Sequence, residues 1–370
     1  MGKAIARLVE PALAGQEAET MMNMGAAKAI ARQWLAEEWE GKPGFLGAIY
    51  CGSTNWKADE MAYVPPSDID ILIWVDGETR TLARLYRDGV ILQPSVLPYS
   101  RLSRTPEEIL GDFRIAAHFS VPSVIADPTG HLTLLQRAIA SEYARRVWVR
   151  ARCERVRTRL DEILDTWLAP DLETDEFWMQ VLDFYYAVFI LSEIVPVADL
   201  RDPTVRKAFS LSREILAKQG RLDLQEALLT LLGCQPMSRA DVEAHFAVYE
   251  NAFDQASAFV YTPFFFSDDV SAAARPVSVG GVRAIIDSGC HREAMFWMVF
   301  IYSVAVKVMQ TDGPDAEKAA YVAQYRQQMA DLGLRTKEDI SARVAQLKAL
   351  VPAFMAVAEE IMNHNPAIQS

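Results

Sequence analysis

Hydrophobic side chains recur with two different periods in the first third of the chain. Between residues 21 and 40 the apolar positions have helical spacing, which predicts a helix that ends at Gly41. Compact apolar runs bounded by Gly and Pro then predict strands. These strands cover residues 45–51, 69–75 and 90–97, with a short edge strand at 124–126, and helices are expected after Thr79 and Pro106.

After Gly130 the strand pattern almost disappears. Helical spacing predicts helices over residues 131–164, 177–195, 203–219, 239–258, 290–310, 314–331 and 337–363. Between Tyr261 and Gly281 the chain is rich in Pro, Ser and Gly, and we expect it to be irregular. The pattern therefore predicts an α+β protein, with a small mixed-sheet domain over residues 1–150 and an α-helical bundle domain over residues 151–370.

Charge separates the two predicted domains. The 370 residues carry a formal net charge of −12, which argues against a protein that binds the backbone of long nucleic acid. Residues 1–150 contain 18 acidic and 16 basic side chains, whereas residues 151–370 contain 31 and 21. We therefore expect the helical half, with a balance of −10, to attract cationic small molecules or partners.

Cysteine spacing and apolar run length bear on the compartment. The four cysteines lie far apart without a CxxC pair, which is typical of reduced thiols. Two apolar runs, 184–192 and 294–306, are shorter than the ~20 residues of a membrane span. The start of the chain lacks the long apolar core of a secretory signal. We expect a cytoplasmic protein that does not contact a membrane.

Candidate chemistry lies between Tyr50 and Asp76. Asp68 and Asp70 flank an apolar residue at the start of a predicted strand, so their side chains project from the same face. Two carboxylates about 7 Å apart repel each other unless a cation lies between them, and Mg²⁺ binds such pairs together with substrate phosphates. Gly52 and Ser53 follow another predicted strand, where backbone and hydroxyl groups can approach a phosphate. Together these residues indicate phosphoryl or nucleotidyl transfer.

Gly52-Ser53, a spacer and then Asp68-x-Asp70 on an apolar strand resembles the polymerase-beta-like nucleotidyltransferase superfamily. The resemblance covers roughly residues 24–165, and the helical remainder is similar in architecture to aminoglycoside nucleotidyltransferases. It implies that Asp68 and Asp70 bind Mg²⁺, and that Gly52 and Ser53 hold the β and γ phosphates of a nucleoside triphosphate. It also implies transfer of a nucleoside monophosphate to an acceptor hydroxyl, with release of pyrophosphate.

Two features of the sequence depart from the family pattern. The spacer between Ser53 and Asp68 is fourteen residues, somewhat longer than usual. The family also places a third carboxylate on its third strand, as a metal ligand or general base, and the matching position here is Gln93. Glutamine offers a carbonyl oxygen to a metal but does not take a proton. Loss of a general base costs about 10²–10⁴-fold in rate.

Three functional hypotheses follow from these observations. In the first, the chain is an enzyme that modifies a small cationic acceptor resembling an aminoglycoside, with Asp68, Asp70 and Gln93 as its catalytic positions. In the second, Gln93 leaves a weak or inactive protein that binds nucleotide as a regulator. In the third, the chemistry is retained and a protein side chain is the acceptor.

Overall fold

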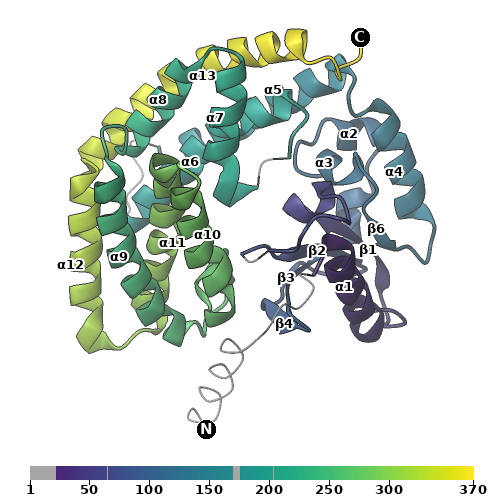
Figure 1. The fold of residues 1–370 in the computed structure, drawn as a ribbon, viewed down its shortest axis with the longest axis horizontal. Coiled ribbons are helices and arrows are strands. Elements are labelled where there is room, and N and C mark those ends of the chain that lie inside the picture. Colours follow the sequence, from purple (N-terminus) through teal and green to yellow (C-terminus); the bar gives the residue numbers. More distant parts are fainter. Residues whose placement is uncertain (1–21, 65, 170–175, 203) are drawn as a thin grey trace.

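The protein has an α+β fold, with a small sheet followed by a large helical part (Figure 1). The computed structural model describes residues 22–64, 66–169, 176–202 and 204–370. Within them the sheet has six strands in the order β3-β5-β2-β1-β6, and β4 pairs with β5 outside this path. The strands are β1 (Phe45–Cys51), β2 (Ile69–Val75), β3 (Arg80–Thr81), β4 (Leu85–Arg87), β5 (Val90–Pro98) and β6 (Val124–Ala126).

The three central strands align the residues with candidate chemistry. β1 and β2 are antiparallel, and Cys51 lies opposite Asp70. β2 and β5 are parallel, and Asp70 lies opposite Gln93. The end of β1, the start of β2 and the middle of β5 therefore meet at one edge of the sheet.

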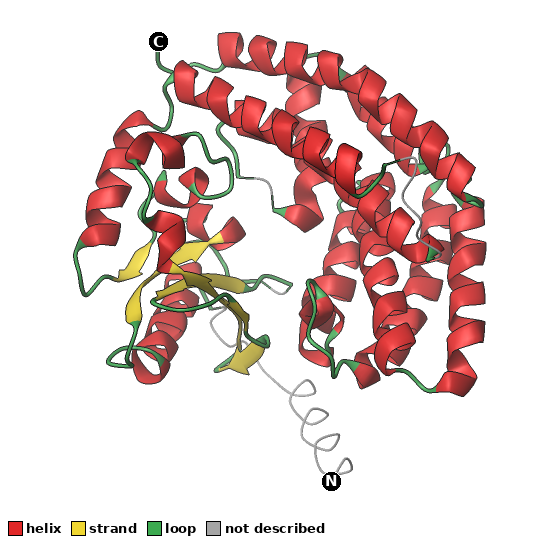
Figure 2. Ribbon diagram, turned by 180° about the vertical axis from the view of Figure 1, so that it is seen from behind, coloured by secondary structure: helices red, strands yellow, loops and turns green. Residues whose placement is uncertain are grey.

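Helices cover both faces of the sheet and form two small cores (Figure 2). The side chains of Ile69, Ile71 and Ile73 pack on one face with α1 (Met24–Glu38). On the other face Trp74 packs with α2 (Pro106–Leu110), α3 (Ala116–Phe119) and α4 (His131–Glu142). Because strand side chains alternate, the Asp70 side chain points to the same face as Trp74.

The helical part encloses one larger core. Most residues of α6 (Phe177–Ala198) and α11 (His291–Asp312) are buried, because both helices are surrounded by other helices. Those helices are α5 (Arg146–Thr166), α7 (Ala208–Lys218), α8 (Leu222–Leu232), α9 (Arg239–Ala256), α10 (Arg275–Asp287), α12 (Asp315–Asp331) and α13 (Lys337–His364). In Figure 1, α5 and α13 run along one side of the molecule, between the sheet and the far helices.

Within the described residues, three helices are long and apolar enough to cross a membrane by length and composition: α6, α11 and α13. Their most apolar stretches are 89%, 83% and 22% buried inside the protein, respectively. The helices that contain the two apolar runs of the sequence are each 22 residues long, longer than the runs themselves.

Most predicted elements are present, and the exceptions are few. The helix expected after Thr79 is wrong, because residues 80–87 form β3 and β4 against β5. The helix expected over 131–164 is interrupted between α4 and α5, where Arg146 N donates to Gln369 O. The segment expected to be irregular becomes helical from Arg275, and α8 was not predicted. The first residues, for which a short helix or an extension was considered, lie outside the described part of the chain.

Candidate functional site

Asp68 and Asp70 form the centre of the candidate site. Asp68 lies directly before β2 and is 7% exposed, and Asp70 is the second residue of the strand. Ile69 and Ile71, which alternate with the two aspartates along the chain, are fully buried on the opposite face of the sheet. The alternation of side chains along a strand predicts this arrangement. Among the described residues, the Asp70 carboxylate has no hydrogen-bond or ion-pair partner. Burial, and then the charge of Asp68, raise the pKa of Asp70 well above its usual range.

The turn after β1 lies against Asp70. Gly52 begins the 3₁₀ helix η1 (Gly52–Trp56) with φ +61°, and a β-carbon there would lie 2.2 Å from Asp70 Oδ2. Only glycine fits this position, since both the backbone angle and the space exclude a side chain. Thr54 Oγ1 donates to Asp68 O at 2.8 Å and joins the turn to the strand. The Ser53 hydroxyl makes no hydrogen bond within the described residues, so it is available to a ligand.

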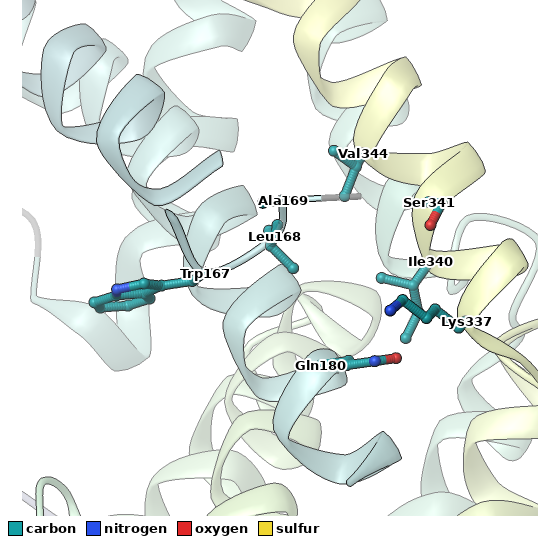
Figure 3. Close-up of a pocket in the computed structure, with 8 residues that line it drawn as sticks. All are labelled: Trp167, Leu168, Ala169, Gln180, Lys337, Ile340, Ser341 and Val344. Atoms are coloured by element: carbon teal, nitrogen blue, oxygen red, sulfur yellow. The ribbon is translucent and has the colours of Figure 1, made fainter. Parts of the chain in front are cut away.

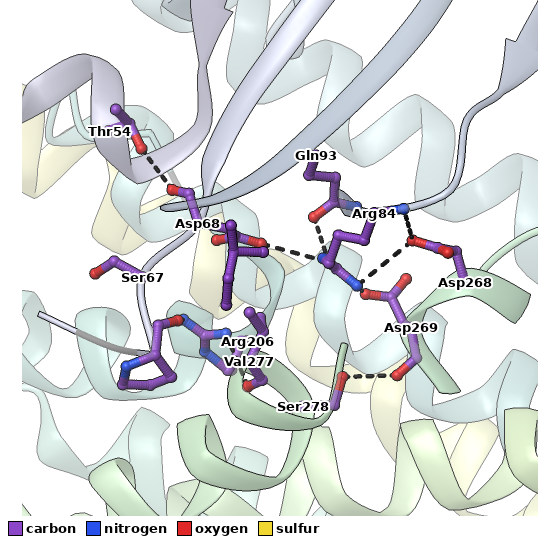
Figure 4. A network of polar contacts seen from close by, with 12 residues as sticks. Thr54, Ser67, Asp68, Arg84, Gln93, Arg206, Asp268, Asp269, Val277 and Ser278 are labelled. Carbon is purple, nitrogen blue, oxygen red and sulfur yellow. Dashed lines mark hydrogen bonds and ion pairs between the residues drawn. The ribbon is translucent and has the colours of Figure 1, made fainter. Parts of the chain in front are cut away.

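Arg84 is buried next to these carboxylates, in the loop between β3 and β4 (Figure 4). Its Nη2 lies 3.4 Å from Asp68 Oδ2 and 3.0 Å from Asp269 Oδ1, and it donates to Gln93 Oε1. The Arg84 backbone N–H donates to Asp268 Oδ2 at 3.1 Å. Burial lowers the pKa of Arg84, but the surrounding carboxylates, led by Asp269, raise it by more. One guanidinium nitrogen therefore contacts oxygens from three segments of the chain.

Asp268 and Asp269 come from the helical part, in the 3₁₀ helix η5 (Ser267–Val270). Asp269 is 7% exposed, and burial raises its pKa although Arg84 opposes the shift. Because Asp269 and Gln93 contact the same nitrogen of Arg84, a carboxylate lies beside the position where this chain has glutamine in place of the expected third carboxylate.

Three further cations gather near Asp68. Arg206, in η3 (Val205–Lys207), donates to Val277 O at 2.9 Å and to Pro66 O at 3.5 Å. Burial and then Arg206 lower the pKa of Lys57, whose Nζ donates to Ser67 Oγ at 2.9 Å. Burial, Arg206 and Lys57 likewise lower the pKa of Lys207. Like charges held this close together favour an anionic ligand.

Several of these residues could not be identified from the sequence. Arg84, Arg206, Asp268 and Asp269 belong to no spacing motif and lie up to about two hundred positions from Asp68 along the chain. The one local signal is the Asp268-Asp269 pair, which follows an aromatic run and one serine in a segment expected to be irregular. Asp268 and Asp269 reach Arg84, and Arg206 reaches Pro66 beside the site, only through tertiary packing.

The carboxylates are suited to magnesium. No group of three or more His, Cys, Asp or Glu side chains is arranged as a ready metal site in the described part of the chain. Mg²⁺ does not require one, since it commonly takes one or two carboxylates together with substrate phosphates and water. The unpartnered carboxylate of Asp70 beside Asp68 fits this ligand set.

A second charged pair connects the α2–α3 loop with α6. Arg114 Nη2 donates to the hydroxyl of Tyr186 at 3.2 Å and lies 3.5 Å from Glu193 Oε2. Glu193 is 3% exposed, and burial raises its pKa to about 7 although Arg114 opposes the shift. This pair brings the loop that precedes α3 against the middle of the most buried helix.

No protein-family model and no curated protein matches the sequence. Among solved structures, the chain matches the crystal structure of a nucleotidyltransferase-like protein from Exiguobacterium sibiricum 255-15. The match covers 82% of this chain and 88% of that one, with 10% sequence identity and a TM-score of 0.27. A TM-score and a sequence identity this low define neither the fold nor the activity. The function is therefore inferred from the geometry of the site.

Proposed function

We propose that this protein is a Mg²⁺-dependent nucleotidyltransferase that moves a nucleoside monophosphate from a nucleoside triphosphate to a hydroxyl of a small acceptor. One observation carries the proposal. The unpartnered carboxylate of Asp70 lies beside Asp68 at the edge of the sheet, and Lys57, Arg206 and Lys207 gather on the Asp68 side. Carboxylates next to clustered cations match a ligand that contains a divalent metal and several phosphates.

Each group at the site has an expected contact with the donor nucleotide. Asp68 and Asp70 would hold Mg²⁺, which neutralises phosphate charge and favours displacement at phosphorus when it is bound. Ser53 and the backbone at Gly52 would donate to the terminal phosphates, since Gly52 has no side chain to keep them away. The three cations would offset the remaining negative charge of the triphosphate.

The proton of the acceptor hydroxyl requires a base that Gln93 does not provide. We assign this role to Asp269, whose carboxylate lies next to Gln93 at Arg84. In the reaction, the hydroxyl oxygen forms a bond to the α-phosphorus and the hydroxyl proton passes to Asp269. The bond from the α-phosphorus to the oxygen that bridges to the β-phosphate breaks, and pyrophosphate leaves with that electron pair.

Nucleotide binding and transfer can be measured separately. Calorimetry would measure binding of ATP, GTP, CTP and UTP in the presence of Mg²⁺, and α-labelled nucleotides would report transfer to a panel of acceptors. Asp70→Asn should abolish transfer, whereas Asp76→Asn, at the other end of β2, should leave it unchanged. The proposal is wrong if no nucleotide binds. Self-labelling of the protein would instead favour a protein side chain as the acceptor.

Arg84 favours a second candidate function, a regulator that binds nucleotide without turnover. Its guanidinium already contacts Asp68, so it occupies space and supplies charge beside a carboxylate that the metal requires. This candidate predicts that the wild type binds nucleotide and releases no pyrophosphate. It also predicts that Gln93→Glu, which restores the third carboxylate on β5, produces transfer.

A further inference from the structure

An aromatic cavity of about 300 Å³ lies in the helical part, beside the segment that supplies Asp269. This volume is at the lower end of the range for small-molecule sites. Its walls are mainly rings, from Trp167, Trp178, Tyr186, Phe265, Phe266 and Phe300. Phe265 is 75% exposed and Trp167 is 38% exposed, so large apolar side chains remain accessible to a ligand. Isolated apolar residues on a surface need no explanation, but rings gathered around one cavity indicate a binding site.

The rings are held in defined positions. Trp167 stacks on Tyr186 with ring centroids 5.7 Å apart and an interplanar angle of 24°. In Figure 3 its indole points away from the neighbouring cavity near Ile340, which has only about 20 Å³ and is suited to a single water. Phe266 packs edge-on against Phe300, with ring centroids 4.9 Å apart. The aromatic walls therefore form a preorganised surface, which lowers the entropic cost of binding.

Phe266 also has a strained backbone. Its φ of +67° lies in the left-handed region, which is unfavourable for a bulky side chain. Residues kept in such conformations cluster at functional sites, because the surrounding structure must hold them there. Three residues later, Asp269 contacts Arg84 at the candidate active site. On the other wall, the Tyr186 hydroxyl accepts the hydrogen bond from Arg114. Both walls of the cavity thus connect to residues that reach the sheet part.

Two charged groups line the cavity, and their contacts with the described residues differ. The Lys307 ammonium lies 4.3 Å from the centre of the Phe264 ring, a favourable cation–π contact. The Asp183 carboxylate is partly buried and has no hydrogen bond or ion pair within the described residues. Burial raises the pKa of Asp183 to about 6, and Lys307 only partly opposes this shift. A ligand that donates a charged hydrogen bond to Asp183 would offset the cost of burying this carboxylate.

We infer that this cavity binds a small molecule with a planar, apolar body and a protonated amine, and that this molecule is the acceptor in nucleotidyl transfer. The rings would stack on the planar body, and Asp183 would pair with the ammonium group. The assignment as acceptor rests on the proposed function, whereas binding to the cavity does not. A body of this kind differs from an aminoglycoside, whose sugar rings carry many hydroxyl groups and would leave the aromatic walls poorly complemented.

Binding can be tested on the full chain, without nucleotide, by calorimetry with three probes of the same shape. The probes are phenethylamine, the neutral phenethyl alcohol and the anionic 3-phenylpropionate. We expect the amine to bind roughly tenfold more tightly than either of the others, because only the amine can form a hydrogen bond between charged groups with Asp183. The inference is wrong if the amine does not bind, or if the carboxylate binds as well as the amine.

Matched variants locate the site. Asp183→Asn should remove the preference for the amine, whereas Asp165→Asn, an exposed acid on α5, should preserve it. Phe265→Ala should weaken binding of the amine, and Tyr261→Ala, an exposed ring four residues earlier that lies outside the cavity, should not. Thermal unfolding of each variant verifies that it is folded. Unchanged amine binding in folded Asp183→Asn would overturn the assignment.

Transfer assays separate this inference from the proposed function. With 2-amino-1-phenylethanol as acceptor, Asp183→Asn should raise the KM for the acceptor roughly tenfold with little change in kcat, because the carboxylate binds the amine and does not act on phosphorus. Amine binding that depends on Asp183, without any nucleotide binding, would leave the cavity assigned and refute the nucleotidyltransferase. Transfer to other acceptors but not to amines of this class would refute the inference alone.

Discussion

The sheet part and the helical part bury charge in different places. In the sheet part, the candidate site lies where β1, β2 and β5 meet, and both faces of the sheet are apolar beyond it. In the helical part, one large apolar core fills the interior, and Arg206 and Asp269 lie where it meets the sheet part. Asp68 obtains its buried ion pair from Arg84, which also binds Asp269. Neither part therefore forms the candidate site alone.

This difference has an energetic consequence. A buried carboxylate is tolerated when a cation or a hydrogen-bond donor is close to it, and otherwise its pKa rises. Asp68 has Arg84, whereas Asp70 has no partner among the described residues. A site with one satisfied and one unsatisfied carboxylate is stable without ligand and still gains free energy when a cation binds.

The largest effect is expected from Asp70→Asn. Removal of this charge should lower the rate of transfer by about 10³-fold or more, because the metal loses one of two carboxylate ligands. The unliganded variant should unfold at the same temperature as the wild type or higher, because it lacks an unpartnered carboxylate whose pKa is raised in the fold. Mg²⁺ and nucleotide should raise the unfolding temperature of the wild type only. Equal stabilisation of both proteins would contradict the role of Asp70.

Arg84→Met tests the connection between the two parts. It leaves Asp68 and Asp269 without their cation, and the free energy of unfolding should fall by about 3–5 kcal/mol in chemical denaturation. Adding Asp269→Asn should recover part of the loss, because it removes one unpaired carboxylate. The control is Arg150→Met, which breaks the exposed pair with Glu359 and should cost less than about 1 kcal/mol. A similar loss in both single variants would show that the Arg84 contacts are not special.

Gly52→Ala tests the packing of the turn against β2. The added carbon would collide with Asp70 Oδ2 and displace the carboxylate, so Mg²⁺-nucleotide affinity should fall by about 10²-fold. Gly41→Ala is a matched control, since Gly41 has φ +82° and nothing within 4 Å of an added β-carbon. Both variants should lose about 1 kcal/mol of stability from backbone strain. Equal nucleotide affinity in the two variants would argue against the turn as part of the site.

The smallest effect concerns a buried acid of the helical part. Because the pKa of Glu193 is about 7 in the fold and near 4.5 when unfolded, its contribution to stability is complete below pH 4.5 and is lost as the pH rises through 7. Relative to Glu193→Gln, the wild type should lose about 2 kcal/mol of unfolding free energy between pH 5 and pH 7. Glu359→Gln, on the surface, should show no such change near pH 7. A constant difference across this range would refute the assignment.

Local sequence patterns predicted the framework of the sheet well. The apolar runs at 45–51 and 69–75 became β1 and β2 with the same bounds, and Gly52, Ser53, Asp68 and Asp70 lie together as their order on those strands implied. The helix predicted after Thr79 was wrong, because residues 80–87 form two short strands that depend on pairing with β5 rather than on their own periodicity. Helix α10 was also missed, since its first half lies in the stretch rich in Pro, Ser and Gly that was expected to be irregular.

By itself, the sequence determined the α+β division of the chain and the position of two carboxylates and a glycine turn at one edge of the sheet. These features follow from alternation along strands and from residues a few positions apart. Only the tertiary structure decided which groups surround them. Arg84 reaches Asp68 from the loop between β3 and β4, and Arg206 and Asp269 come close through packing of the helical part against the sheet. The aromatic cavity combines rings from α6, α11, the end of α5 and the segment before η5. Such contacts between distant residues leave no periodic signal, because they depend on how whole helices pack.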